Sequence, residues 1–259
     1  MEIIIVILSS FVIAFISPLI YRIFKHLTGW VLSLVPLALF IYFATYLPQI
    51  CAEECRTFAF VYHWVPSFGI DLSFYLDGIA LIFSLIITLI GAFVVLYGGE
   101  YLRNHQHINR FFIYIFFFMG SMIGVVLSSN LITIFIFWEL TSFSSYLLIG
   151  FNNERAESRY AALQALLITG LCGLALLAGF ILLGQIGESY EITELLTRGH
   201  LIRAHSFYLP ALILILIGAF TKSAQVPFHF WLPSAMEAPT PVSTYLHSAT
   251  MVKAGVYLL

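Results

Sequence analysis

The sequence predicts an all-α membrane protein that crosses the bilayer several times. Its 259 residues are 61% hydrophobic and only 9% charged, against about 25% charged residues in an average soluble domain. Mean hydropathy is +0.99. A soluble protein of this size needs a charged surface that so few ionisable side chains cannot supply. The net charge of −2 also leaves no basic field for nucleic acid, so soluble enzymes and nucleic-acid binders are excluded.

Eight apolar stretches are candidates for membrane-spanning helices, for which about 20 residues are needed. They cover residues 3–21, 30–47, 77–98, 111–128, 131–151, 161–186, 208–231 and 241–259. Their length and the lack of strand-like alternation favour helices over a barrel. We expect an N-terminal segment of two helices and an external loop over residues 1–76, followed by the main membrane domain over 77–259.

The distribution of basic residues predicts the orientation in the membrane. One set of loops carries Arg22, Lys25, Arg103, Arg110, Arg155 and Arg159, and the opposite set carries Arg56, Arg198 and Arg203. Basic residues collect in cytoplasmic loops, so the first set is expected in the cytoplasm and the N-terminus outside. The first apolar run lacks the features of a cleaved signal, so we expect it to remain as a span.

The two loops expected on the outer side carry few clues to chemistry. Cys51 and Cys55 lie in the external loop over 48–76, where an oxidising space permits a disulfide but does not require one. A zinc site would need more ligands than the nearby His63, so no metal is expected. The loop over 187–207 is read as a solvated connection.

Two helix starts are visible in the sequence. Asp77 is predicted to cap the third span, because a carboxylate is favourable at a helix N-terminus. Thr240 as N-cap, with Pro241 at the first helical position, predicts the start of the last span. That span is still apolar at Leu259 and has no stop signal, so the chain is expected to be part of a longer protein.

Glu139 lies inside the apolar run over 131–151, with Ser142 and Tyr146 on the same helical face. A charge in mid-bilayer costs about 2.5–3.5 kcal/mol on insertion scales, so such a residue faces protein or water. We interpret Glu139 as a proton-carrying site. The alternative is a structural ion pair that only locks two helices together.

Lys222 is a second buried charge, in the run over 208–231. Gln225 and His229, three and seven residues further along, are expected to share its face. Pro227 breaks the backbone hydrogen bonds of that run, and broken backbone at membrane depth is tolerated where it is buried or lines a cavity. Together these residues predict a hydrated proton path, whereas the alternative is a lysine that reaches to the membrane surface from a helix end.

His247 and Lys253 both lie in the last apolar run and, six residues apart, point in different directions. Histidine titrates near neutral pH and suits a proton relay. A satisfied core histidine is the alternative for His247 alone, but a second ionisable residue in the same span favours a relay. No phosphate-binding loop, haem ligand pair or iron–sulfur cysteine set is present, so no cofactor is expected.

Three motifs in this order resemble the antiporter-type subunits of respiratory complex I and of the Mrp sodium/proton antiporters. The first is Leu76-Asp77-Gly78, and the second is Trp138-Glu139 with Ser145–Phe151. The third comprises 222–228 (KSAQVPF), 238–243 (APTPVS) and 247–255 (HSATMVKAG). The resemblance runs from residue 70 to the end and is dense from residue 128.

The resemblance implies a bundle of two inverted five-helix repeats, each with a broken helix. The five spans over 111–259 would be the first repeat. Glu139 and Lys222 would form the charged pair of a proton half-channel, and His247 and Lys253 would carry protons along the bundle axis. The accessory residues would be His229, Gln225 and Ser142, with Pro227 at the helix break.

Within this superfamily the sequence is most similar to the large subunit of the Mrp antiporters. In the complex I branch Gly commonly replaces Ser142, and an Arg and an Asp replace Gly170 and Gly173. The resemblance implies a subunit of a multisubunit Na⁺/H⁺ antiporter in the bacterial cytoplasmic membrane, with smaller hydrophobic partner subunits. Two alternatives are a proton-pumping membrane subunit of an NADH:quinone oxidoreductase and a scaffold that transports nothing.

Overall fold

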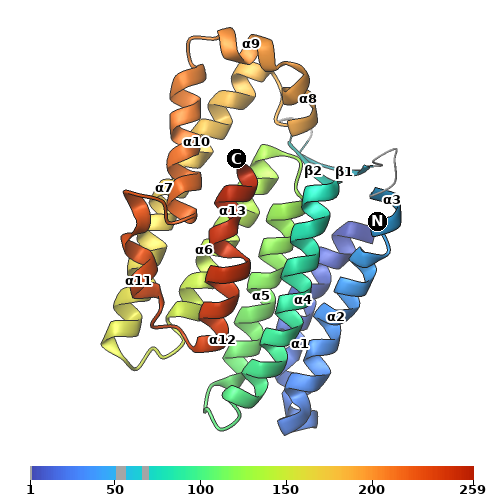
Figure 1. Ribbon diagram of the computed structural model, residues 1–259, viewed down its shortest axis with the longest axis vertical. Coiled ribbons are helices and arrows are strands. Elements are labelled where there is room, and N and C mark those ends of the chain that lie inside the picture. The colour runs from blue at the N-terminus through green and yellow to red at the C-terminus, as the bar shows by residue number, and fades with distance from the viewer. Residues whose placement is uncertain (1, 51–56, 66–69) are drawn as a thin grey trace.

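The structure is a computed structural model that describes residues 2–50, 57–65 and 70–259. Long, roughly parallel helices form a bundle, and a β-hairpin and two short helices lie at one end (Figure 1). Cys51 and Cys55, for which the sequence leaves a disulfide open, lie outside the described residues. The division of the chain at residue 76 remains a prediction.

The first half of the chain contributes six helical segments and the hairpin. In order these are α1 (Glu2–Phe24), a 3₁₀ turn (Lys25–Leu27), α2 (Thr28–Ala44), α3 (Leu47–Ile50), β1 (Phe58–Val65), β2 (Ile70–Leu76), α4 (Gly78–Tyr101) and α5 (Ile108–Leu127). Helix α1 packs against α5, and α2 packs against α4. Asp77 caps α4 as predicted, because its Oδ1 accepts a hydrogen bond of 2.7 Å from the backbone N–H of Ala80.

The second half contains two long helices and several short ones. They are α6 (Leu131–Ile149), α7 (Ala156–Gly187), α8 (Ile192–Thr197), α9 (Gly199–Ala204), α10 (Tyr208–Lys222), a 3₁₀ turn (Phe228–Phe230), α11 (Trp231–Ala235), α12 (Thr240–Ser243), a π-helical turn (Thr244–Ala249) and α13 (Met251–Leu258). Helix α6 packs between α5 and α7, and α10 packs against α7 and α13.

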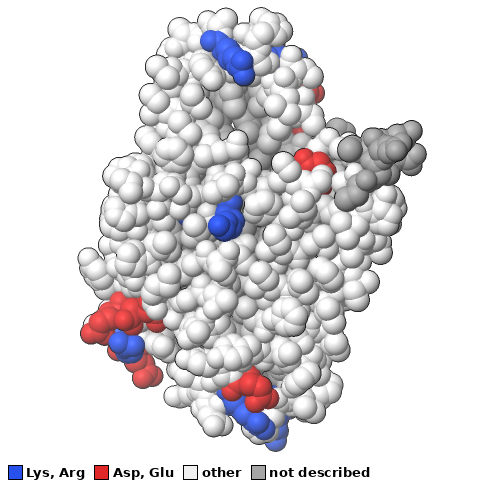
Figure 2. All heavy atoms as spheres, in the orientation of Figure 1, with Lys and Arg blue, Asp and Glu red and all other residues white. Residues whose placement is uncertain are grey.

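The helices confirm the expected all-α membrane fold. Among the described residues, five helical stretches are long and apolar enough to cross a membrane, and the first of them joins α1 to α3. Helix α10 is apolar but shorter. Charged side chains gather at the two ends of the molecule and leave a mostly uncharged band between them (Figure 2). The loops with Arg103, Arg110 and Arg155 lie at the opposite end from α8 and α9 (Figure 1), as the basic-residue pattern predicts.

One local expectation was wrong, and two segments read only as connections contain secondary structure. The external loop contains the antiparallel β1–β2 hairpin, whose register pairs Phe58 with Leu76. The connection over 187–207 folds into α8 and α9. Thr240 is the first residue of α12 rather than its cap, and Pro239 stands at the N-cap position without a side-chain hydrogen bond.

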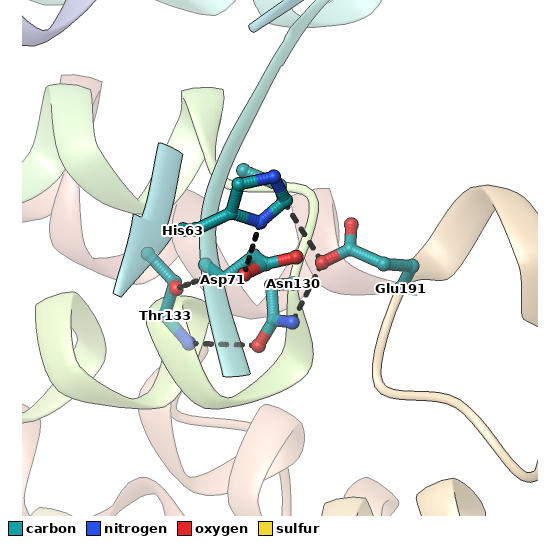
Figure 3. A network of polar contacts seen from close by, with 6 residues as sticks. His63, Asp71, Asn130, Thr133 and Glu191 are labelled. Atoms are coloured by element: carbon teal, nitrogen blue, oxygen red, sulfur yellow. Dashed lines mark hydrogen bonds and ion pairs between the residues drawn. The ribbon is translucent and has the colours of Figure 1, made fainter. Parts of the chain in front are cut away.

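The hairpin is tied to the bundle by a polar network (Figure 3). Glu191 Oε1 accepts hydrogen bonds from Ser73 Oγ at 2.8 Å and Asn130 Nδ2 at 2.7 Å. Asn130 also caps α6, because its Oδ1 accepts from the N–H of Ile132 at 3.0 Å. The Thr133 hydroxyl donates to the carbonyl of Asp71 at 3.0 Å. Contacts between β2, the start of α6 and Glu191 therefore fix where α6 begins. They also fix the position of the later α6 residues along the helix axis.

Candidate functional site

Lys222 is the centre of the candidate site. It is the last residue of α10 and only 1% of its surface is exposed. Its Nζ donates hydrogen bonds to the carbonyl oxygen of Trp138 at 3.0 Å and to Ser142 Oγ at 2.6 Å. The same nitrogen lies 5.1 Å from the centre of the Trp138 ring, within reach of a cation–π attraction. A buried ammonium group is thus held by neutral groups of α6.

The backbone after Lys222 explains why α10 ends there. Ala224 has a left-handed backbone with φ of 51°, and the Val226–Pro227 peptide is cis. Gln225 N–H then donates to the carbonyl of Phe220 at 2.8 Å and closes the helix. Trp231 Nε1 donates to the carbonyl of Thr221 at 2.9 Å, which satisfies a carbonyl that the helix end leaves without a partner. The predicted break near Pro227 is confirmed.

Glu139 follows Trp138 on α6 and turns toward α7. Its carboxylate packs against Gly173, where a Cβ would overlap Oε1, and a Cβ on Gly170 would lie 4.0 Å from Oε2. Oε1 is buried and has no hydrogen-bond partner among the described residues. Gly173 therefore makes the room that this carboxylate occupies, and Gly170 lies beside it at a distance where a Cβ would make only an ordinary contact.

Glu139 and Lys222, the charged pair that the resemblance implies, are not joined by a direct ion pair. Among the described residues, no carboxylate oxygen lies within 4.0 Å of Lys222 Nζ. The two groups are nevertheless close enough for their charges to interact. Trp138 and Ser142, on either side of Glu139 in the sequence, bind the ammonium group instead. The two charged residues belong to one site without being locked together.

Gln225 and His229 do not share a face with Lys222. That expectation assumed a continuous helix, but α10 stops at Lys222 and the chain turns before α11. The side chains of Gln225 and His229 are both exposed. The helical spacing was wrong for these two residues because the break comes earlier than Pro227 alone indicates.

His247 lies in the π-helical turn between α12 and α13. Its ring is half-buried and lies 6.2 Å from that of Trp231, between ring centres. Both ring nitrogens are buried without a hydrogen bond of normal geometry to any described residue. The Thr250 hydroxyl donates to the carbonyl of Tyr245 at 2.6 Å across the turn, and Lys253 is exposed on α13.

Among the described residues, several buried polar atoms without partners belong to the site, and others lie elsewhere, on Ser10, Tyr62, Ser84, Asn109 and Gln164. Besides Glu139 Oε1 and the His247 nitrogens, those of the site include Trp138 Nε1 and Ser223 Oγ. Buried polar atoms in proteins are nearly always hydrogen-bonded, by protein or by internal water. The site can therefore bind water beside its ionisable groups. In the described part of the chain, no group of three or more His, Cys, Asp or Glu residues could hold a metal ion.

Comparison with known proteins identifies the family. Residues 128–259 match the family model described as NADH:quinone oxidoreductase/Mrp antiporter, TM. The chain belongs to this family. Residues 63–112 also match the family model of the N-terminus of chain 5 of NADH-ubiquinone oxidoreductase (complex I).

The Na⁺/H⁺ antiporter subunits A1 of Staphylococcus haemolyticus and Staphylococcus aureus are among the similar members of the family. Each is 48% identical over 256 residues, which is 98% of this chain and 32% of the relative. The chain thus spans about a third of the length of these relatives. Its similarity to them confirms the resemblance to the large Mrp subunit.

Two solved structures share the fold. A chain in the Mrp complex from Dietzia sp. DQ12-45-1b matches all of this chain over 28% of its own length, with a TM-score of 0.88 and 34% identity. A chain of the archaeal membrane-bound sulfane sulfur reductase matches 99% of this chain over 52% of its own length, with a TM-score of 0.78 and 22% identity. The second similarity concerns the fold alone.

Sequence reasoning missed two features of this family member's site. Trp138 binds Lys222 through its backbone carbonyl and the face of its ring. The sequence shows Trp138 only as part of a motif and does not reveal this role. Gly170 and Gly173 stand out only as departures from the complex I branch. Two glycines three residues apart in an apolar helix are a sign of close packing, and that sign was available in the sequence.

Proposed function

We propose that the chain is part of the large subunit of a multisubunit Na⁺/H⁺ antiporter in the bacterial cytoplasmic membrane. Protons enter through this subunit while sodium ions leave, and smaller hydrophobic subunits are its partners. The names of the staphylococcal relatives and the match to a chain of the Mrp complex support this assignment. No cofactor is needed, because the membrane potential and the proton gradient supply the energy.

One observation carries the proposal: Lys222 is buried beside Glu139 without being paired with it. A buried lysine fixed in a permanent ion pair stays charged, because removing one partner's charge is costly. Neutral oxygens from Trp138 and Ser142 can bind either protonation state of the amine. The charge of Lys222 can therefore respond to the protonation of Glu139, which is the behaviour a proton carrier needs.

The proposed path runs from Glu139 and Lys222 to His247 and Lys253. His247 suits the middle of it, because its ring nitrogens are buried, form no hydrogen bond of normal geometry with the described residues, and can accept or donate a proton. Ser142 is an accessory residue that holds Lys222, and Pro227 belongs to the break that ends α10. Gln225 and His229 are exposed in the segment after that break, and we assign them accessory roles.

The energy for sodium export comes from charge movement. Each elementary charge that crosses 100 mV is worth about 2.3 kcal/mol. A cycle that admits more protons than it expels sodium ions moves net positive charge inward, and the membrane potential then drives it.

A second candidate is a proton-pumping subunit of an NADH:quinone oxidoreductase, which both family models name. The packing of Glu139 favours the antiporter. In the complex I branch the resemblance implies an Arg and an Asp at the places of Gly170 and Gly173. In this chain the Glu139 carboxylate fills the room beside Gly173, so an Asp at that position could not be added without moving the carboxylate.

Proton flux in inside-out membrane vesicles tests the function. The vesicles carry the complete complex, respiration is blocked, and a pH gradient across the membrane is followed with a fluorescent dye. Collapse of the gradient on addition of sodium supports an antiporter. Proton pumping that follows quinone reduction and ignores sodium would support the second candidate. A complex that assembles but gives neither response would leave the chain as a scaffold.

A further inference from the structure

A cavity of about 500 Å³ lies where α5, α6 and α7 meet. Its lining comes from the first turns of α5 and α7, the last turns of α6 and the loop that follows. The residues are Arg110, Tyr114, Tyr146, Leu147, Gly150, Phe151, Asn153, Arg159, Ala162 and Leu163. This is the end of the bundle that the basic-residue pattern assigns to the cytoplasm, so the cavity lies at the inner membrane surface.

The lining has the chemistry of an anion site. It contains two guanidinium groups and two phenol groups, and none of its residues is acidic. Among the described residues, neither Arg110 nor Arg159 forms an ion pair with a carboxylate, whereas Arg103, Arg155 and Arg198 each do. The charges of the cavity are therefore uncompensated within the described protein.

Arg159 is held in place by the loop below it. Its Nη1 donates to the carbonyls of Asn153 at 2.7 Å and Glu154 at 3.0 Å. Those two bonds use one nitrogen and leave the rest of the guanidinium fork available. A guanidinium group with unused donors favours two-point binding of a phosphate group. Arg110 lines the same cavity from α5. Its guanidinium group forms no hydrogen bond or ion pair with the described residues.

The surface next to the cavity is apolar and extends from the cavity toward the bilayer centre, along α6 and α7. Phe143 lies one helical turn from Leu147 on α6, and Leu167 lies one turn from Leu163 on α7. Phe143, Leu163 and Leu167 are each about half exposed, at 49%, 49% and 53%. A polar cavity at the membrane surface thus continues into an exposed apolar stripe toward the bilayer centre.

We propose that this cavity binds the phosphate headgroup of an anionic phospholipid from the cytoplasmic leaflet. Arg110 and Arg159 bind the phosphate, and Tyr114 and Tyr146 mark the headgroup level. The acyl chains lie along the stripe of Phe143 and Leu167. Basic pockets between membrane helices on the cytoplasmic side are suited to such headgroups, and a free phosphate ion would gain nothing from the apolar stripe.

The test is lipid binding to the complete, purified complex, measured by native mass spectrometry. Phosphatidylglycerol and phosphatidylcholine are titrated onto wild type, Arg110→Gln and the matched control Arg103→Gln, whose arginine lies at the same end but pairs with Glu100. We expect Arg110→Gln to weaken phosphatidylglycerol binding about fivefold, the worth of one basic residue near an anionic surface. Phosphatidylcholine binding and the Arg103→Gln variant should stay unchanged.

Two further measurements keep the result decisive. Arg110→Lys keeps the charge, so it should restore much of the phosphatidylglycerol binding and show that Arg110→Gln had not simply misfolded. Inorganic phosphate should not displace the lipid at equal concentration. Equal losses in Arg110→Gln and Arg103→Gln, or displacement by inorganic phosphate alone, would overturn the lipid site. Sodium-dependent proton flux is not needed for any of these readouts.

Discussion

Oε1 of Glu139 occupies the space beside the α-carbon of Gly173 in which any other residue would carry its Cβ. The Glu139 carboxylate can take this position against α7 only because Gly173 has no side chain. A Cβ on Gly170, one turn away, would make only an ordinary contact with Oε2 at 4.0 Å. Trp138 and Ser142 bind Lys222 on the other side, so a single turn of α6 holds the acidic and the basic group in separate places.

Gly173→Ala should displace the Glu139 carboxylate and reduce sodium-driven proton flux, because the added methyl group overlaps Oε1. Alanine is the better helix former, so a loss of flux would come from the site and not from a weaker helix. We expect at least a tenfold loss, since about 1 Å of displacement of a reacting group can cost two orders of magnitude. Dye-monitored flux in vesicles measures it.

The matched control is Gly199→Ala, because a Cβ on Gly199 would meet nothing within 4 Å. It should leave the flux at the wild-type level. If Gly173→Ala transports as fast as Gly199→Ala, the packing against α7 has no bearing on transport.

Ser142→Ala removes the shorter of the two hydrogen bonds to Lys222, at 2.6 Å. A hydrogen bond to a charged group is worth about 1.5–3 kcal/mol, and the buried amine has no other side-chain partner among the described residues to replace it. We expect a lower melting temperature of the purified complex and a lower flux. Ser144→Ala is the control, because the Ser144 hydroxyl donates only to carbonyls of its own helix, those of Leu140 and Thr141. Equal melting temperatures for the two variants would show that the bond to Lys222 contributes no stability.

Trp138→Phe tests what the indole ring adds to the backbone carbonyl. The bond from Lys222 to the Trp138 carbonyl remains, while the smaller ring gives a weaker cation–π attraction and loses the unpartnered Nε1. We expect a partial loss of flux, smaller than that of Ser142→Ala. Trp30→Phe, on the exposed face of α2, should behave as wild type. Complete loss in Trp138→Phe would mean that the ring, rather than the carbonyl, holds Lys222.

Asn130→Ala should destabilise the outer end of the bundle. It removes the cap of α6 and the bond to Glu191 at 2.7 Å, and loss of a cap alone typically costs about 1 kcal/mol. We expect a lower melting temperature of the purified complex with flux retained in the variant that assembles. The exposed Asn104→Ala is the comparison, and no difference between the two would contradict the network in Figure 3.

Much of the fold could be predicted because membrane helices are visible in the sequence as long apolar runs. The cap at Asp77 and the break near Pro227 were also readable, since each depends on residues close in sequence. The β1–β2 hairpin was not, because its strands are stabilised by contacts with Ser129 and Glu191, distant in the chain. The strands, FAFVYHWV and IDLSFYL, are rich in aromatic and aliphatic residues, but segments this short do not reveal which distant residues they contact.

The site was predictable in its members but not in its contacts. Glu139 and Lys222 stand out because charges are costly in the membrane. Their separation depends on how α6 sits between α7 and α10, which no local pattern contains. Gln225 and His229 were placed wrongly for a related reason: the left-handed turn at Ala224 ends the helix before Pro227, and alanine gives no warning of such a turn.

The most direct test of the account is sodium-driven proton flux in Glu139→Gln. Glutamine has nearly the same shape and fits the same gap beside Gly173, but it cannot take up a proton. The flux is measured in inside-out vesicles with the amount of assembled complex quantified, beside wild type and the exposed control Glu100→Gln. The account predicts normal assembly and flux at the background of vesicles without the complex. Wild-type flux in Glu139→Gln would contradict the claim that this carboxylate carries the proton.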